Sequence, residues 1–142
     1  MRLRMNFAPV LLFALAAVLV AQDRFTDEHD GILRGFTMSP GEHIMNEYEG
    51  VPELRTVSGQ IVDESGGKCD GALFELRTED PDSPVRGVRT NKDGRFRMLA
   101  VRPGVYVFKV TLNGFQSVYG KLKVTRTAPE RNTLDIELWL GV

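Results

Sequence analysis

The chain has 142 residues, which gives room for one domain with one hydrophobic core. Hydrophobic residues make up 42% of it and charged residues 26%, as in folded domains rather than disordered chains. The formal net charge is −1 and the sequence has no evident basic stripe, which argues against binding of nucleic acid by charge.

Residues 1–21 predict a secretory signal peptide. Arg2 and Arg4 form a basic leader, the stretch from Phe7 to Ala21 carries no charge, and Gln22 opens a polar segment. A basic leader, a short apolar run and a small residue at its end are typical of export signals. We therefore expect a secreted or periplasmic protein whose mature chain begins near Gln22.

Two alternatives to a cleaved signal concern the membrane. The apolar run is shorter than the roughly 20 residues that cross a bilayer. However, Leu19 is larger than the residue that usually stands two places before a cleavage site. An uncleaved anchor is therefore the alternative, and we expect contact with a membrane only in that case. A lipoprotein is disfavoured because the only cysteine, Cys69, lies far downstream.

Residues 22–54 form a lead-in with no clean helical or strand period. The turn signals around Pro40 and Gly50 leave room for a short helix over about Glu42 to Tyr48. Otherwise we expect an irregular segment that lies along the domain or extends from it.

From Thr56 onward, short runs of alternating apolar and polar residues are separated by turns rich in glycine, proline, asparagine and aspartate. This spacing predicts an all-β fold over residues 55–142, an antiparallel β-sandwich of about seven strands. A helical bundle is excluded because no run keeps the period of a helix. The alternation directs the following residues inward: Val57, Ile61, Ala72, Phe74, Leu76, Phe96, Met98, Tyr106, Phe108, Val110, Val118, Leu122, Val124, Leu134, Ile136, Leu138 and Leu140.

Several stretches of this region follow a known pattern. They are Val57 to Asp63 (VSGQIVD), Gly71 to Leu76 (GALFEL), Thr90 to Met98 (TNKDGRFRM), Val101 to Val110 (VRPGVYVFKV) and Asn113 to Phe115 (NGF). They resemble the carboxypeptidase regulatory-like family. The resemblance implies a transthyretin-like, pre-albumin-type sandwich, similar also to starch-binding-like and collagen-binding B-type modules. Turn and core residues carry the match, so it implies a fold and leaves the function open.

The sequence contains no recognisable catalytic constellation, and we expect no catalytic residue, cofactor or metal site. His29 and His43, the only histidines, could join an acidic residue around a metal ion, but the ligand spacing of known sites is missing. The acidic candidates are Asp27, Glu28, Asp30 and Glu47. The resemblance extends to transthyretin-like hydrolases, which rely on histidines. Residues 55–142 contain none, so we do not expect that activity.

Two further groups of side chains are interpreted as turn residues. Cys69 stands in a polar, glycine-rich stretch without a neighbouring histidine or helix N-terminus, so we expect an exposed or half-buried loop residue. Glu79, Asp80 and Asp82 could bind calcium, but they lack the spacing of calcium loops and Pro81 stiffens the segment.

Four residues form the expected interaction surface: Val105, Val107, Tyr119 and Trp139. The two valines make their strand apolar on both faces, which requires a cover. The cover is either the lead-in, with Phe25, Ile32, Leu33 and Phe36 as anchors, or another protein. Tyr119 and Trp139 are directed outward, where aromatic rings can stack on sugars.

Three functions follow from these features. The first is a non-catalytic module that binds a protein partner, or acts as an accessory or structural component, in the cell envelope or the secreted space. The second is a carbohydrate-binding module, which would make a glycan the partner. The third, least supported, is a small hydrolase or metal-dependent enzyme.

Overall fold

The computed structural model describes residues 32–40, 42 and 45–141. The chain divides into two compact units, Met1–Arg34 and Gly35–Val142, and only residues 32–34 of the first unit are described. The predicted signal peptide and the mature start near Gln22 lie outside the described residues, as do Phe25, His29 and His43. No helix among the described residues is long and apolar enough to span a membrane. The fold below is that of the second unit.

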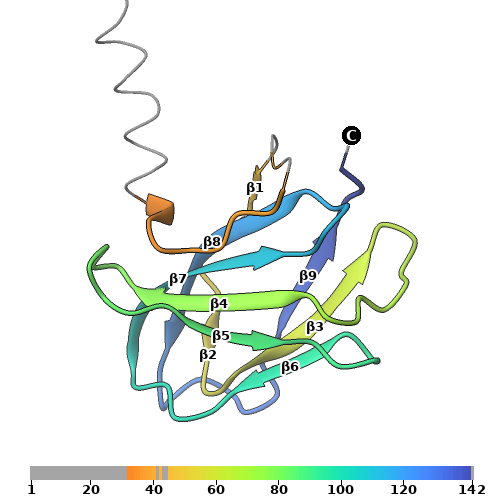
Figure 1. Cartoon of the computed structure of the whole chain (residues 1–142). Coiled ribbons are helices and arrows are strands. Elements are labelled where there is room, and N and C mark those ends of the chain that lie inside the picture. The colour runs from red at the N-terminus through yellow and green to blue at the C-terminus, as the bar shows by residue number, and fades with distance from the viewer. Residues whose placement is uncertain (1–31, 41, 43–44, 142) are drawn as a thin grey trace, which may run out of the picture. The chain divides into compact units, whose positions relative to one another are not determined.

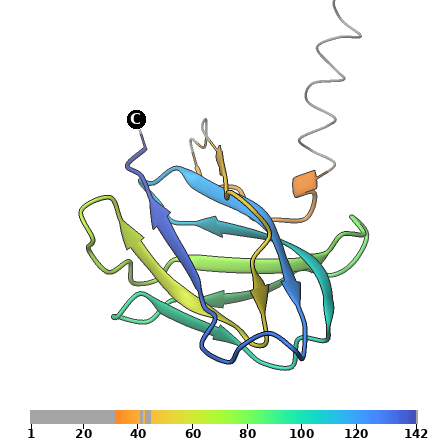
Figure 2. The same cartoon turned by 180° about the vertical axis from the view of Figure 1, so that it is seen from behind.

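Two β-sheets make up this unit, which confirms the predicted all-β sandwich (Figure 1; Figure 2). The larger sheet has six strands in the order β1-β8-β7-β4-β5, and β2 also pairs with β8. The smaller sheet has three strands in the order β6-β3-β9. The strands are β1 (Met45–Glu47), β2 (Glu53–Leu54), β3 (Val57–Asp63), β4 (Leu73–Thr78), β5 (Arg86–Arg89), β6 (Arg95–Met98), β7 (Gly104–Thr111), β8 (Ser117–Val124) and β9 (Leu134–Leu138).

Three pairings depart from the antiparallel pattern expected of the sandwich. β1 and β2 run parallel to β8, and β9 runs parallel to β3. The last pairing brings the two backbones very close, because a Cβ added at Gly59 would lie 1.7 Å from the carbonyl oxygen of Leu134. Only glycine fits at that position, so the parallel closure of the small sheet depends on one residue of β3.

Within the stretch from Glu42 to Tyr48, where the sequence left room for a short helix, Met45–Glu47 form strand β1 instead. The amide of Tyr48 donates to the carbonyl of Tyr119 at 2.7 Å, and the Tyr48 ring meets Phe108 edge-on at 5.7 Å. The edge of β8 offers unpaired backbone groups, and pairing with them outweighs a weak local helix signal. Residues 45–54 therefore belong to the larger sheet, and the sandwich begins before residue 55.

The core contains three aromatic rings in series. Phe74 stacks on Phe96 at 4.3 Å between centroids and on Phe108 at 5.8 Å. Nearly all the residues predicted to point inward are buried, and Tyr106 is partly buried against them. Leu140 is the exception at 59% exposed, because β9 ends at Leu138.

Cys69 also differs from the expectation of an exposed or half-buried loop residue, because it is buried at 5% exposure. Its amide donates to the carbonyl of Ile61 at 3.0 Å, and its carbonyl accepts from the Thr90 hydroxyl at 2.6 Å. These bonds fold the glycine-rich turn against β3, so the small thiol joins the core.

The inward side chain of β6 gives a test of the register. Phe96→Ala removes a ring that is 4% exposed, and we expect the free energy of unfolding to fall by about 3–5 kcal/mol. Arg97→Ala on the same strand is the control, because the Arg97 side chain is exposed. Chemical denaturation measures both variants. An unchanged midpoint for Phe96→Ala would contradict the assignment of faces.

Candidate functional site

Three charged residues on the outer face of the six-stranded sheet are buried. Glu75 and Arg77 on β4 and Lys109 on β7 point away from the core, as alternation requires, yet their exposures are 6%, 2% and 1%. Lys109 stands directly between Glu75 and Tyr119 in the sheet register. Buried charges are tolerated only when they are paired or hydrogen-bonded, so this face must have a cover.

The cover consists of residues 36–40 and 42, here named the docked segment. The amide of Thr37 donates to Glu75 Oε1 at 2.9 Å, and its hydroxyl donates to Oε2 at 3.1 Å. In return, Lys109 Nζ donates to the carbonyl of Thr37 at 2.9 Å and to Glu42 Oε2 at 3.0 Å. Phe36, 7% exposed, lies beneath the guanidinium of Arg77, whose carbon is 4.9 Å from the ring centroid.

The sequence predicted that something covers the outer face of the strand that contains Val107, and these contacts show that the docked segment lies on that face. Of the four lead-in anchors expected from the sequence, Phe36 lies on the face, but polar groups make most of the attachment. Burial lowers the pKa of Arg77 from its ordinary value, and Asp80 opposes that shift without reversing it. Through the hydrogen bonds given above, Glu75 and Lys109 tether the docked segment to the sheet.

Removing the buried ammonium tests that tether. Lys109→Met leaves Glu42 buried with no cation, and its Oε1 already has no partner among the described residues. We expect the free energy of unfolding to fall by about 3 kcal/mol or more, and hydrogen exchange at the Thr37 amide to accelerate.

Lys121→Met is the matched control for that experiment. Lys121 pairs with Glu79 at 3.6 Å with both side chains half exposed, so the loss should stay below about 1 kcal/mol. Equal effects of the two variants would mean that the buried pair does not hold the segment.

The four residues of the expected interaction surface do not form one surface. Val107 is buried at 4% exposure, which removes it from any accessible surface, whereas Val105 is 40% exposed. Tyr119 is half-buried on β8, and burial, followed by the charge of Glu47, raises its pKa. Trp139, 52% exposed, directly follows β9 in the other sheet.

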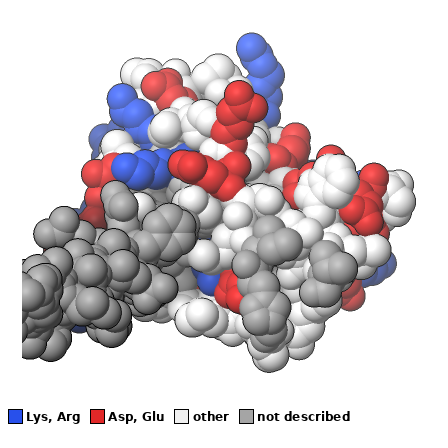
Figure 3. Space-filling view, turned by 90° about the horizontal axis from the view of Figure 1, so that it is seen from above, with Lys and Arg blue, Asp and Glu red and all other residues white. Residues whose placement is uncertain are grey.

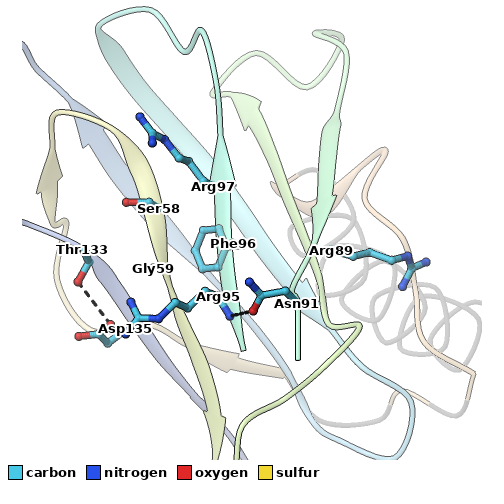
Figure 4. A pocket seen from close by; sticks show the side chains of 9 residues that line it. All are labelled: Ser58, Gly59, Arg89, Asn91, Arg95, Phe96, Arg97, Thr133 and Asp135. Carbon is cyan, nitrogen blue, oxygen red and sulfur yellow. Dashed lines mark hydrogen bonds between the residues drawn. The ribbon is translucent and has the colours of Figure 1, made fainter. Parts of the chain in front are cut away.

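An open hollow of about 410 Å³ lies over the outer face of the three-stranded sheet (Figure 4). β6 directs Arg95 and Arg97 outward, while Phe96 between them enters the core. The sheet register sets Arg95 opposite Gln60 and Arg97 opposite Ser58 on β3. Figure 4 shows Arg95 reaching across β3 toward Asp135 on β9, whereas Arg89 points away from that pair.

This basic group is a feature that the sequence analysis missed. From Arg86 to Arg102 the chain carries five arginines and Lys92 against one carboxylate, Asp93. Because β5 and β6 lie at adjoining edges of the two sheets, the fold gathers these charges. On the face shown in Figure 3, by contrast, blue and red side chains both appear among the described residues. Counting the net charge of short sequence stretches, rather than of the whole chain, would have revealed this basic group.

The match to a family model covers residues 56–138, more than half of the chain, and its description is carboxypeptidase regulatory-like domain. The chain belongs to this family. The matched residues of the carboxypeptidase regulatory-like domain run from the start of β3 to the end of β9. The docked segment, β1 and β2 precede the match, and Trp139 follows it.

Two solved structures are similar to the chain at low sequence identity. The 5-hydroxyisourate hydrolase of Klebsiella pneumoniae is 17% identical over 61% of this chain and 92% of that chain, with a TM-score of 0.45. Hydroxyquinol 1,2-dioxygenase of Pseudomonas putida DLL-E4 is 14% identical over 75% and 64%, with a TM-score of 0.44. The match thus spans less than two thirds of that dioxygenase. Nothing about function follows from these likenesses, and a comparison with curated protein sequences gave no match.

The groups considered for chemistry have structural surroundings in this carboxypeptidase regulatory-like domain. Burial, followed by the charge of Asp63, raises the pKa of the Cys69 thiol, so little thiolate is present at neutral pH. Asp80 accepts the amide of Asp82 at 3.0 Å, as an ordinary turn residue does. Among the described residues, no group of three or more histidine, cysteine or acidic side chains could hold a metal ion.

Proposed function

We propose that the chain is an exported, non-catalytic binding module, delivered by residues 1–21 to the secreted or periplasmic space. It acts there through protein interaction or as an accessory component of the envelope, and its working face is the outer face of the three-stranded sheet. The observation that carries the proposal is the different use of charge on the two sheets. The outward charges of β4 and β7, in the middle of the larger sheet, are buried in the tether to the docked segment, whereas Arg95 and Arg97 on the smaller sheet are exposed.

The chemistry of the open face supports binding rather than a packing role. Ser58 and Gln60 are half-buried in the centre of the face, with Arg95 and Arg97 on one side and Asp135 on the other. Surface patches of this kind position a ligand by several directed polar contacts on a rigid sheet. A non-catalytic module also agrees with the surroundings of Cys69, which is buried, and of Asp80, which accepts a turn hydrogen bond.

Photo-cross-linking in the producing cell tests the working face. A photoreactive residue replaces Gln60 on β3, and we expect one dominant cross-linked species in the exported fraction. The same replacement at Val105, on the larger sheet and 40% exposed, should give none or a different one. Identical patterns from the two positions, or no product from Gln60, would count against the three-stranded sheet as the working face.

Carbohydrate binding is a second candidate function, favoured by the exposure of Trp139. The indole follows β9 and is 52% exposed, and the preceding Glu137 is exposed as well. An exposed indole beside polar groups offers a stacking surface and hydrogen bonds to a sugar ring.

A glycan array probed with the wild-type chain and Trp139→Ala separates these functions. If the indole forms the sugar site, the variant loses the bound glycans, with about a tenfold loss of affinity for a stacking contact of this size. Glycans bound equally by both proteins would exclude Trp139, and an array without any signal would favour a protein partner.

A further inference from the structure

We infer that the hollow on the three-stranded sheet binds an acidic saccharide, with Arg95 and Arg97 holding its carboxylates. This inference rests on the proposed function as an accessory component of the envelope, since it assigns a saccharide, in place of a protein partner, to the same working face. The residues that carry it are the two arginines of β6 and Asp135 of β9, together with the neutral polar groups between them.

The two guanidinium groups are available for a ligand. Among the described residues, neither the Arg95 nor the Arg97 guanidinium has a hydrogen bond or an ion pair. Other arginines of the domain are engaged: Arg86 donates to the carbonyls of Leu99 at 2.6 Å and Ala100 at 3.2 Å, and Arg55 pairs with Glu130 at 2.9 Å. Arg95 and Arg97 are therefore free to bind an oxyanion in the bidentate manner that guanidinium favours.

The strand fixes the spacing of the two groups. Residues two apart on one face of a strand are roughly 7 Å apart, so two like charges face solvent side by side. Phe96 between them stacks on Phe74 at 4.3 Å, and the Asn91 side chain accepts from the Arg95 amide at 3.0 Å. Because these contacts and the pairing with β3 hold the strand, the backbone that carries the pair is fixed before any ligand arrives, which lowers the entropic cost of binding.

Asp135 decides between a saccharide and an acidic peptide. Figure 4 shows this carboxylate on the side of the hollow toward which Arg95 extends. Ionised aspartate and glutamate side chains carry only acceptors and so offer this carboxylate no hydrogen bond, whereas the hydroxyls of a sugar acid donate to it. Ser58, Asn91 and Thr133 add neutral donors and acceptors around the same space. Carboxylates and hydroxyls together are the chemistry of a uronic-acid chain, which fits both sides of the hollow.

Calorimetry with the full chain and a short oligogalacturonate tests the inference, and the methyl-esterified oligomer serves as the uncharged probe. We expect the free acid to bind and the ester to bind at least tenfold more weakly. The double variant Arg95→Gln/Arg97→Gln should lose at least tenfold in affinity for the acid. Arg126→Gln, an exposed arginine outside the hollow, is the matched control and should bind as the wild type does.

Asp135→Ala separates the two acidic ligands. The variant removes the same repulsive charge for both ligands, but it removes a hydroxyl acceptor only for the oligogalacturonate, so binding of poly-glutamate should gain relative to binding of the oligogalacturonate. Poly-glutamate binding as tight as that of the sugar acid to the wild type would overturn the inference, as would equal binding of acid and ester or unchanged binding by the double variant.

Failure of the inference and failure of the proposed function are distinguishable. If no oligogalacturonate binds while cross-linking from Gln60 still captures one species, the sugar acid is the wrong ligand and the working face stands. If both fail, the working face is wrong as well. All variants in the hollow change exposed side chains, so thermal melts serve to verify that each one is folded.

Discussion

The ammonium group of Lys109 is the constraint on which the arrangement of this domain depends. It stands on the central strand of the larger sheet, points away from the core, and is nonetheless 1% exposed. An unpaired charge in that position would cost several kcal/mol, so its partners must be held in place whenever the domain is folded. The partners are the carbonyl of Thr37 and the carboxylate of Glu42, both far earlier in the chain. The segment before the sandwich is thereby a part of the fold.

This tether divides the two outer faces of the domain between different tasks. On the larger sheet, Phe74 to Arg77 of β4 and Val107 to Thr111 of β7 are buried on both sides, as strands in the middle of a covered sheet are. Their outward charged residues, Glu75, Arg77 and Lys109, contact the docked segment. The smaller sheet has polar residues such as Ser58 and Gln60 on its outer face, with exposed arginines beside them. The outward residues of β4 and β7 thus contribute to folding stability through the docked segment. The exposed residues of the smaller sheet have no such role and can serve in binding.

Alternation was sufficient to predict the inner set, because every second residue of a strand points to the same face, and Phe74, Phe96 and Phe108 each stand at an inward position of their own strand. It could not predict what lies on the outer side. Glu75 and Lys109 alternate outward as the sequence indicates, but alternation says nothing about a segment that docks there from another part of the chain. The parallel pairing of β9 with β3 was missed for a similar reason, since register across distant segments depends on the close approach at Gly59.

The two-residue period of a strand also explains why Arg95 and Arg97 lie on the same face of β6. Phe96 must point inward to complete the aromatic stack, so its neighbours Arg95 and Arg97 must both point outward. Nothing in the packing requires either to be an arginine, because any polar residue would serve on an exposed face. Two adjacent like charges are slightly unfavourable for the free protein, and salt weakens that repulsion only in part. An anion bound between them would remove the repulsion and bind only to the folded state, so binding and stability would be linked. A pair that is slightly unfavourable alone and favourable with a ligand is the pattern expected of a binding residue rather than a folding residue.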